Sequence, residues 1–178
     1  MRPNRQIYTA LGLMSGTSMD GIDIALLSTD GANSIDFGPT LSVDYPSEFR
    51  RTLETGLQEA LEIKDRADRP GSLSVLEREI SDRHAEAVNQ FLTKYALSAE
   101  KIDFIGFHGH TILHRPDDGL TVQLGNGAAL AEATGIDVVF DMRAADMKNG
   151  GQGAPLVPVF HQALARREKL NKPVCFVN

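Results

Sequence analysis

The chain has 178 residues, of which 42% are hydrophobic and 24% are charged, and its formal net charge is −6 at pH 7. This size and composition are typical of one soluble globular domain. The negative charge argues against a nucleic-acid-binding protein, which would normally carry a basic face. The single cysteine, Cys175, cannot form an internal disulfide bond, and no run of residues is apolar enough to predict a signal peptide or a membrane span. We therefore expect a soluble, cytoplasmic protein with no nucleic-acid or membrane partner.

The N-terminal part of the sequence predicts a β-hairpin, further strand structure and a helix. The apolar runs at residues 7–13 and 22–27 flank a loop rich in Gly, Ser and Thr, which is typical of a hairpin. Residues 34–45 predict one or two more strands, broken at Gly38-Pro39. A helix is expected from Ser47 onward. Its apolar residues recur every four positions, at Phe49, Leu53, Leu57 and Leu61.

The rest of the sequence alternates between strands and helices. A polar loop at residues 65–72 ends in Pro-Gly-Ser, and a long helix is expected from 73 to about 97. The elements expected after it are strands at 102–107, 121–124 and 136–140, helices at 128–134 and 156–169, a glycine-rich loop at 149–153, and a strand starting at Pro173. Hairpin strands followed by this alternation predict an α/β fold with a mixed sheet and helices on its faces.

The hairpin loop, within GLMSGTSMDGID at residues 12–23, suits an oxyanion. Its glycines let the backbone approach a ligand, and successive N–H groups can form an anion-binding nest. Further donors are the hydroxyl groups of Ser15, Thr17 and Ser18. Asp20 and Asp23 could hold Mg²⁺, which prefers carboxylates and phosphate oxygens. The loop lacks the GxxxxGK[ST] pattern of a P-loop, and a polar turn without a ligand is the alternative interpretation.

The stretch HGHTILHRP at residues 108–116 brings three histidines close together, at 108, 110 and 114. We expect it to form a loop beyond the end of a strand, where ligands collect in α/β sheets. A zinc site is one interpretation, because closely spaced imidazoles can share a metal. Against zinc, no acidic or cysteine ligand lies at a familiar spacing, and we expect His108 and His110 to point to opposite faces if the strand continues. The other interpretation is that one histidine binds a substrate while the others are structural.

Asp141 follows the apolar residues IDVVF, so we expect it at the tip of a buried parallel strand, beside Arg143. A carboxylate in that position can act as a general base. A salt bridge between Asp141 and Arg143 is the structural alternative. The stretch DMRAADMKNGGQGAP at residues 141–155 is expected to be a loop at the same edge of the sheet, and its GGQGAP part, at residues 150–155, is expected to form a lip over a crevice there or a simple loop before a helix.

Taken together, these stretches resemble the anhydro-N-acetylmuramic acid kinase family. The resemblance covers GLMSGTSMDGID at 12–23, GFHGHTILHRP at 106–116 and the long run from VQLGNG to VPVFH at 122–161. It implies a ribonuclease-H-like mixed sheet with helices on both faces, which is the first half of the fold shared by sugar kinases, Hsp70 and actin. It also implies an enzyme that opens 1,6-anhydro-N-acetylmuramic acid and phosphorylates it to N-acetylmuramate 6-phosphate in peptidoglycan recycling, with ATP and Mg²⁺.

The resemblance also implies roles for individual residues. Asp141 aligns with the catalytic base of the family. The ATP phosphate loop is implied to comprise Ser15, Gly16, Thr17, Ser18, Met19, Asp20, Gly21 and Asp23, with Asp20 and Asp23 as Mg²⁺ ligands. The implied substrate-binding residues are His108, Arg143, Gln152 and Arg115, and either arginine could bind the lactyl carboxylate. The resemblance favours a homodimer for the full-length protein.

The sequence departs from the family at three positions and is expected to be incomplete. Met14 replaces an aspartate that is common in the superfamily, while His110 and Met142 stand where glutamine and phenylalanine are expected. We expect residues 1–172 to form an N-terminal domain, residues 173–178 to begin a second one, and the isolated chain to be inactive. A non-catalytic module that binds a muramic sugar is the alternative function, and a histidine-metal hydrolase is a third.

Overall fold

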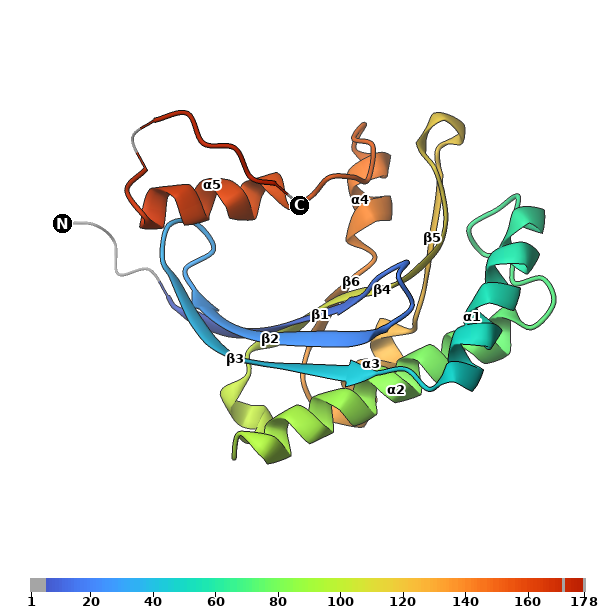
Figure 1. Cartoon of the computed structure of the whole chain (residues 1–178), viewed down its shortest axis with the longest axis horizontal. Coiled ribbons are helices and arrows are strands. Elements are labelled where there is room, and N and C mark those ends of the chain that lie inside the picture. The colour runs from blue at the N-terminus through green and yellow to red at the C-terminus, as the bar shows by residue number, and fades with distance from the viewer. Residues whose placement is uncertain (1–5, 171, 178) are drawn as a thin grey trace.

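The computed structural model describes residues 6–170 and 172–177, and its six strands form one sheet with helices on both faces (Figure 1). The strands are β1 (Tyr8–Ser15), β2 (Gly21–Thr29), β3 (Ile35–Asp44), β4 (Phe104–Arg115), β5 (Leu120–Leu124) and β6 (Val138–Phe140). The α-helices are α1 (Ser47–Glu59), α2 (Leu73–Lys94), α3 (Gly127–Thr134), α4 (Met142–Lys148) and α5 (Pro158–Arg167). Short 3₁₀ turns lie at η1 (Ala60–Glu62), η2 (Ala99–Lys101) and η3 (Pro116–Asp118).

The strand order β3-β2-β1-β4-β5 combines antiparallel and parallel pairs. β1, β2 and β3 form an antiparallel meander, while β1 runs parallel to β4. The other edge of β4 is shared: its first part pairs in parallel with β6, and its later part pairs antiparallel with β5. This arrangement confirms the predicted mixed sheet and is consistent with the ribonuclease-H-like half of the actin fold.

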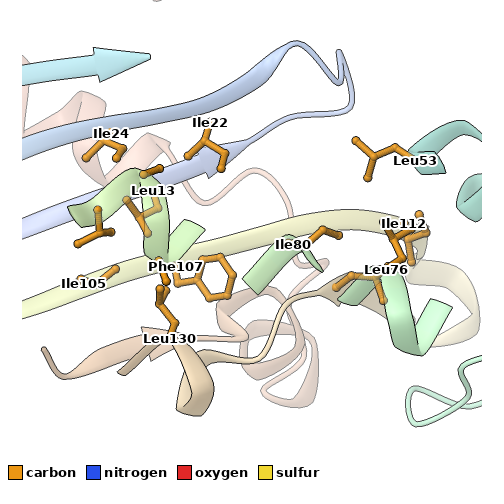
Figure 2. Close-up of a cluster of buried hydrophobic side chains, with 14 of the residues drawn as sticks. Leu13, Ile22, Ile24, Leu53, Leu76, Ile80, Ile105, Phe107, Ile112 and Leu130 are labelled. Carbon is orange, nitrogen blue, oxygen red and sulfur yellow. The ribbon is translucent and has the colours of Figure 1, made fainter. Parts of the chain in front are cut away.

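The hydrophobic core lies between the sheet and helices α1, α2 and α3 (Figure 2). Fully or almost fully buried side chains of this core include Leu13, Ile22, Ile24, Leu53, Leu76, Ile80, Ile105, Phe107 and Leu130. Leu76, Ile80 and Phe91 occupy one side of α2, as their spacing predicts, although the helix ends at Lys94 rather than near residue 97. Burial of each such side chain contributes about 1.5–3 kcal/mol.

Helix α1 begins at Ser47 as predicted, but its apolar face does not extend to Leu61. Phe49 and Leu53 are buried, whereas Leu61 is 59% exposed in the turn η1. The α-helix ends at Glu59, and the 3₁₀ turn that follows has a period of about three residues. Ala60 and Ile63 therefore take the buried positions, and the prediction for Leu61 was wrong.

Strand β3 is continuous, so the predicted break at Gly38-Pro39 does not occur. The ladder between β2 and β3 shifts its register beside these two residues, and Leu26 lies opposite them. A side chain at Gly38 would collide with the side chain of Leu26. Proline has no N–H to donate to a neighbouring strand. It is tolerated in β3 because β3 lies at the edge of this sheet.

Two stretches expected to be loops form regular structure. Residues 108–115 continue strand β4, so the prediction of a loop after residue 107 was wrong. Residues 142–148 form α4, so the prediction of a loop over this stretch was wrong. The expected strand at 136–140 shortens to β6, whose Val139 and Phe140 are 50% and 46% exposed; the prediction that this strand is buried was also wrong.

Helix α5 lies on the face of the sheet opposite α2 and α3 (Figure 1). It is shorter than the predicted helix at 156–169, and none of its residues is buried. Residues 172–177 form no helix or strand, so the prediction of a strand starting at Pro173 was wrong for these residues, and residue 178 lies outside the described part of the chain. The second domain expected to begin at residues 173–178 stays a prediction. No helix within the described residues is both long and apolar enough to span a membrane.

Candidate active site

A cleft runs along the face of the sheet that the core does not use. Alternate residues of β1 point to the two faces, so Leu11 and Leu13 enter the core while Gly12 and Met14 line the cleft. Two adjoining cavities of about 490 and 680 Å³ form it. Residues common to both cavities are Met14, His108, Met142 and Val157. The cleft therefore joins the N-terminal hairpin to β4 and to the segment between α4 and α5.

The hairpin loop at residues 16–20 is a tight turn with exposed hydroxyl groups. The N–H of Met19 donates to the carbonyl of Gly16 at 3.0 Å, and Met19 has a left-handed φ of 55°. Thr17 and Ser18 are exposed, and the Ser18 hydroxyl donates to Asp20 Oδ1 at 2.7 Å. This hydrogen bond lowers the pKa of the Asp20 carboxyl and favours its ionised form.

The base of this loop is anchored to the sheet and to α1. The carbonyl of Asp20 accepts hydrogen bonds from the Tyr45 N–H at 2.8 Å and from Arg50 Nη2 at 3.2 Å. A Cβ at Gly21 would collide with the carbonyl of Val43, so glycine is required for the close approach of β2 and β3. The loop is therefore held in one position while its hydroxyl groups stay accessible.

Ser15 differs from the other predicted loop residues because its side chain is fully buried. Its hydroxyl lies 2.9 Å from the Tyr45 hydroxyl and 3.0 Å from His110 Nδ1. Burial raises the pKa of Tyr45 to about 12, so its hydroxyl stays neutral. The Ser15 hydroxyl thus connects β1 to β4 and to Tyr45, the residue directly after β3, instead of facing the loop.

Asp23 lies on β2, beyond the loop, and lines the cleft. It pairs across the ladder with Met14 and accepts a hydrogen bond from Ser42 Oγ at 2.5 Å. Asp20 instead lies at the end of the loop, so the two predicted Mg²⁺ ligands belong to different segments. Within residues 6–170 and 172–177, no three His, Cys, Asp or Glu side chains gather into a metal site.

Asp141 lies directly after β6, with a left-handed φ of 59° at the start of α4. Its Oδ1 accepts a hydrogen bond from Arg66 Nη2 at 2.6 Å, and its side chain remains 39% exposed. Arg66 is fixed in turn by its Nε, which donates to the Thr121 carbonyl at 3.1 Å. The predicted alternative of a salt bridge with Arg143 was therefore wrong, because the partner of Asp141 is Arg66.

Arg143 and His108 form a polar pair on the cleft. Arg143 Nε donates to His108 Nε2 at 3.0 Å, and Arg143 Nη1 donates to the Gly153 carbonyl at 2.6 Å. His108 Nδ1 lies 2.8 Å from the Gly109 carbonyl, so the Nδ1–H tautomer satisfies both contacts. Burial and then the positive charge of Arg143 lower the pKa of His108, which favours the neutral imidazole. Arg143 consequently supplies the positive charge of this pair.

The three clustered histidines do not converge on a common point. His108 lines the cleft, His110 is buried beside Ser15, and His114 hydrogen-bonds Thr121 Oγ1 at 3.0 Å. His108 and His110 face different environments, as expected. Strand alternation does not explain this, because residues two positions apart in a regular strand point to the same face. Gly109 has a left-handed φ of 69°, and the ladder with β1 shifts register there. This bulge separates the two rings, and the geometry does not support a zinc site.

The other two predicted substrate residues lie farther from the cleft. Arg115 ends β4 at the tip of the hairpin with β5, opposite Leu120, and lines neither cavity. Gln152 is exposed in the glycine-rich loop, next to Gly153. The Gly153 N–H donates to Asp146 Oδ2 at 2.8 Å, so α4 holds this loop over the edge of the cleft. The structure brings His108 and Arg143 together with the glycine-rich loop at residues 149–153, whereas Arg115 lies away from this group.

No pattern in the sequence indicates two further residues of the site, Arg66 and Gln123. Arg66 lies in the polar loop before α2, 75 residues from its partner Asp141, and no local pattern links them. Gln123 lies on β5 and lines the cleft near His108. Its position in the strand at 121–124 was predicted, but a single glutamine in a short strand carries no signal for a site.

Comparison with known proteins identifies relatives of this chain. A model of the anhydro-N-acetylmuramic acid kinase family matches residues 8–177. An anhydro-N-acetylmuramic acid kinase of Rhizobium etli is 54% identical over 173 residues, which cover 97% of this chain and 47% of the relative. Relatives of the same description in Brucella canis and Agrobacterium fabrum are 58% and 51% identical, with 46% and 47% of their lengths covered. The chain thus spans about half the length of the curated relatives it matches.

Proposed function

Because the chain belongs to the anhydro-N-acetylmuramic acid kinase family, we propose that it forms the part of an ATP-dependent kinase that holds the base and one phosphate loop. The proposed reaction opens 1,6-anhydro-N-acetylmuramic acid and produces N-acetylmuramate 6-phosphate during peptidoglycan recycling in the cytoplasm. The observation that supports it best is the placement of Asp141. This carboxylate is partly exposed and shares a hollow with His108, which also lines the cleft beside the hairpin.

The reaction needs a base because water is a poor nucleophile. Asp141 takes a proton from water as the water oxygen bonds to the anomeric carbon C1 of the sugar. The bond between C1 and O6 breaks with its electron pair going to O6, and O6 then bonds to the γ-phosphorus of ATP. The bond from that phosphorus to the bridging oxygen breaks, and ADP leaves. Catalysis thus depends on positioning and on stabilising charge on the phosphoryl group.

Arg143 is the proposed partner of the lactyl carboxylate of the sugar. It lines the cleft next to His108 and holds the glycine-rich loop through the Gly153 carbonyl. His108 is neutral and adds no charge, but it accepts the hydrogen bond from Arg143 Nε and so orients the guanidinium group. Gln152, in the same loop, stays a predicted contact, whereas Arg115 lies at a hairpin tip and is not part of this proposal.

The hairpin loop is the proposed phosphate site. Its exposed Thr17 and Ser18 hydroxyls and its glycines suit phosphate oxygens. Mg²⁺ usually binds proteins through one or two carboxylates together with substrate phosphates, and exposed, ionised Asp20 fits that mode. Asp23, which faces the cleft, is the second proposed ligand. When bound, the ion would neutralise charge on the phosphates.

Coverage of about half of each relative supports a division of the active site between this chain and a further segment. We propose that residues 1–178 alone show no measurable turnover, because the chain holds only one of the phosphate loops expected in the family. The full-length protein is proposed to be a homodimer on the same family resemblance.

The test of the proposed function is Asp141→Asn in the full-length protein. Turnover should fall about 10²–10⁴-fold while ATP still binds, because only the proton acceptor is lost. Asp118→Asn, in the hairpin between β4 and β5, is the matched control and should keep wild-type turnover. Wild-type turnover in Asp141→Asn would overturn the proposal. Sugar binding by the wild-type protein without any ATP-dependent step would establish the non-catalytic alternative.

A further inference from the structure

The Asp141 carboxylate does not bond the helix that it precedes. Asp141 is the N-cap residue of α4, a position where an aspartate side chain commonly accepts a hydrogen bond from an N–H of the first turn. Its side chain makes no such bond. Its φ of 59° lies in the left-handed region, which a residue other than glycine adopts at an energetic cost. The carboxylate is therefore held by a group outside its own helix.

The group that holds the carboxylate is the guanidinium of Arg66. Its Nη2 donates to Asp141 Oδ1 at 2.6 Å, and its Nε donates to the Thr121 carbonyl on β5 at 3.1 Å. Because the guanidinium is planar and rigid, these two bonds fix Asp141 relative to the sheet. Arg66 lines neither cavity of the cleft, nor the small hollow that Asp141 shares with His108. Its influence on a reaction in the cleft would therefore act through Asp141.

The loop that carries Arg66 is fixed by its own hydrogen bonds. Asp68 Oδ2 accepts hydrogen bonds from the N–H groups of residues 64 and 65, at 2.9 and 2.8 Å. Arg69 Nη1 donates to the carbonyl of Arg66 at 2.8 Å. Arg69 also donates through Nε and Nη2 to the carboxylate of Glu77 on α2, at 3.0 and 2.9 Å. The backbone of Arg66 is thus tied to α2, while its side chain is tied to β5.

The exposure of the pair argues against a role in folding alone. The side chains of Arg66 and Asp141 are 45% and 39% exposed, and ion pairs at such exposure contribute little to the free energy of unfolding. The left-handed backbone at Asp141 lowers that free energy further. Costly backbone conformations of this kind cluster at active sites, where the surrounding structure maintains them.

We propose that Arg66 is a positioning residue that determines which oxygen of Asp141 acts as the base. This inference rests on the proposed function. Arg66 occupies Oδ1, whereas Oδ2 has no hydrogen-bond partner within residues 6–170 and 172–177. The proton of the attacking water is therefore transferred to Oδ2 while the water oxygen bonds to the anomeric carbon. Oδ1 keeps its hydrogen bond to Arg66 during this step.

Loss of the guanidinium should lower turnover more than it lowers substrate binding. Without Arg66 the carboxylate is free to rotate and to accept the hydrogen bond from α4 that it lacks in this structure. Displacing a catalytic group by about 1 Å can cost roughly 100-fold in rate. We therefore expect kcat of Arg66→Met to fall about 10- to 100-fold. The KM values for the sugar and for ATP should change little, because Arg66 does not line the cleft.

The experiment is a double-mutant cycle in the full-length enzyme. Steady-state kcat and KM are measured for Arg66→Met, for Asp141→Asn and for the variant with both substitutions. If Arg66 acts through Asp141, its substitution should cause no further loss of kcat in the Asp141→Asn background. An arginine that only stabilised the fold would cause the same fold-loss in both backgrounds. Arg78→Met, at an exposed arginine of α2, is the matched control and should keep wild-type kcat.

Folding of each variant is checked by urea denaturation, and Arg66→Ala replaces Arg66→Met if the latter does not fold. Wild-type or increased kcat in a folded Arg66 variant would overturn the inference. Equal losses in the two backgrounds would also overturn it. These results would leave the proposed function intact, because that function is tested by Asp141→Asn alone.

Discussion

Two histidines in the core should make the stability of this chain depend on pH. His84 of α2 and His110 of β4 are both fully buried. His84 Nδ1 contacts the Ile80 carbonyl at 2.7 Å and His110 Nδ1 contacts Ser15 Oγ, but neither Nε2 has a partner among the described residues. Burial, with the neighbouring histidines adding to it, lowers the pKa of each from 6.5 to about 4.

The direction of the effect follows from comparing the two states. Between about pH 6.5 and pH 4 the unfolded chain binds protons at these positions and the folded chain does not, so stability falls as the pH falls. From pH 7 to pH 5, each histidine should remove about 2 kcal/mol of unfolding free energy. His84 and His110 together should therefore remove about 4 kcal/mol, a large share of the stability of an ordinary domain.

Urea denaturation of the 178-residue chain at pH 7 and pH 5 measures this loss. His110→Gln removes one of the two buried titrations, so the difference between the two pH values should shrink by about 2 kcal/mol. His161→Gln, at a partly exposed histidine of α5, is the control and should keep the wild-type difference. An equal pH dependence in wild type and His110→Gln would refute the argument.

Two other substitutions test local features of the fold and the site. Asn126 Oδ1 accepts a hydrogen bond from the Ala129 N–H at 3.0 Å and so caps α3. Asn126→Ala should therefore lower the unfolding free energy by about 1 kcal/mol in urea denaturation, and an unchanged midpoint would contradict this. Gly151→Ala places a Cβ against the carboxylate of Asp146, which accepts a hydrogen bond from the Gly153 N–H. Since the Gly153 carbonyl accepts a hydrogen bond from Arg143, the KM of the full-length enzyme for the sugar should rise. A wild-type KM would show that the loop does not position Arg143.

Long, regular patterns in the sequence predicted most of the fold. The hairpin of β1 and β2 and the helix α2 were recognised because their apolar residues repeat over many positions. Helix α4 was missed because it has seven residues and only Ala144 is buried, which is too short for a helical period to appear. The extension of β4 was missed because the bulge at Gly109 interrupts the alternation of its side chains.

The candidate site was predictable only where its residues follow one another in the chain. The hairpin loop, the histidine cluster and Asp141 stand out in the sequence because glycines, hydroxyls or imidazoles gather there or because an apolar strand precedes them. The substrate-binding roles of His108 and Arg143 come from the family resemblance and stay predictions. The contact between Arg66 and Asp141 arises from packing of distant segments.

The hydrogen bond between Ser15 and His110 has a mechanical consequence. Ser15 is the residue immediately before the hairpin turn, and its hydroxyl ties that point to the middle of the sheet and to Tyr45. A displacement of the base of the turn would therefore have to break its hydrogen bonds to His110 of β4 and to Tyr45, which directly follows β3. Under the proposed function, a phosphate group bound at this turn would therefore meet a site whose base has a fixed position relative to the cleft.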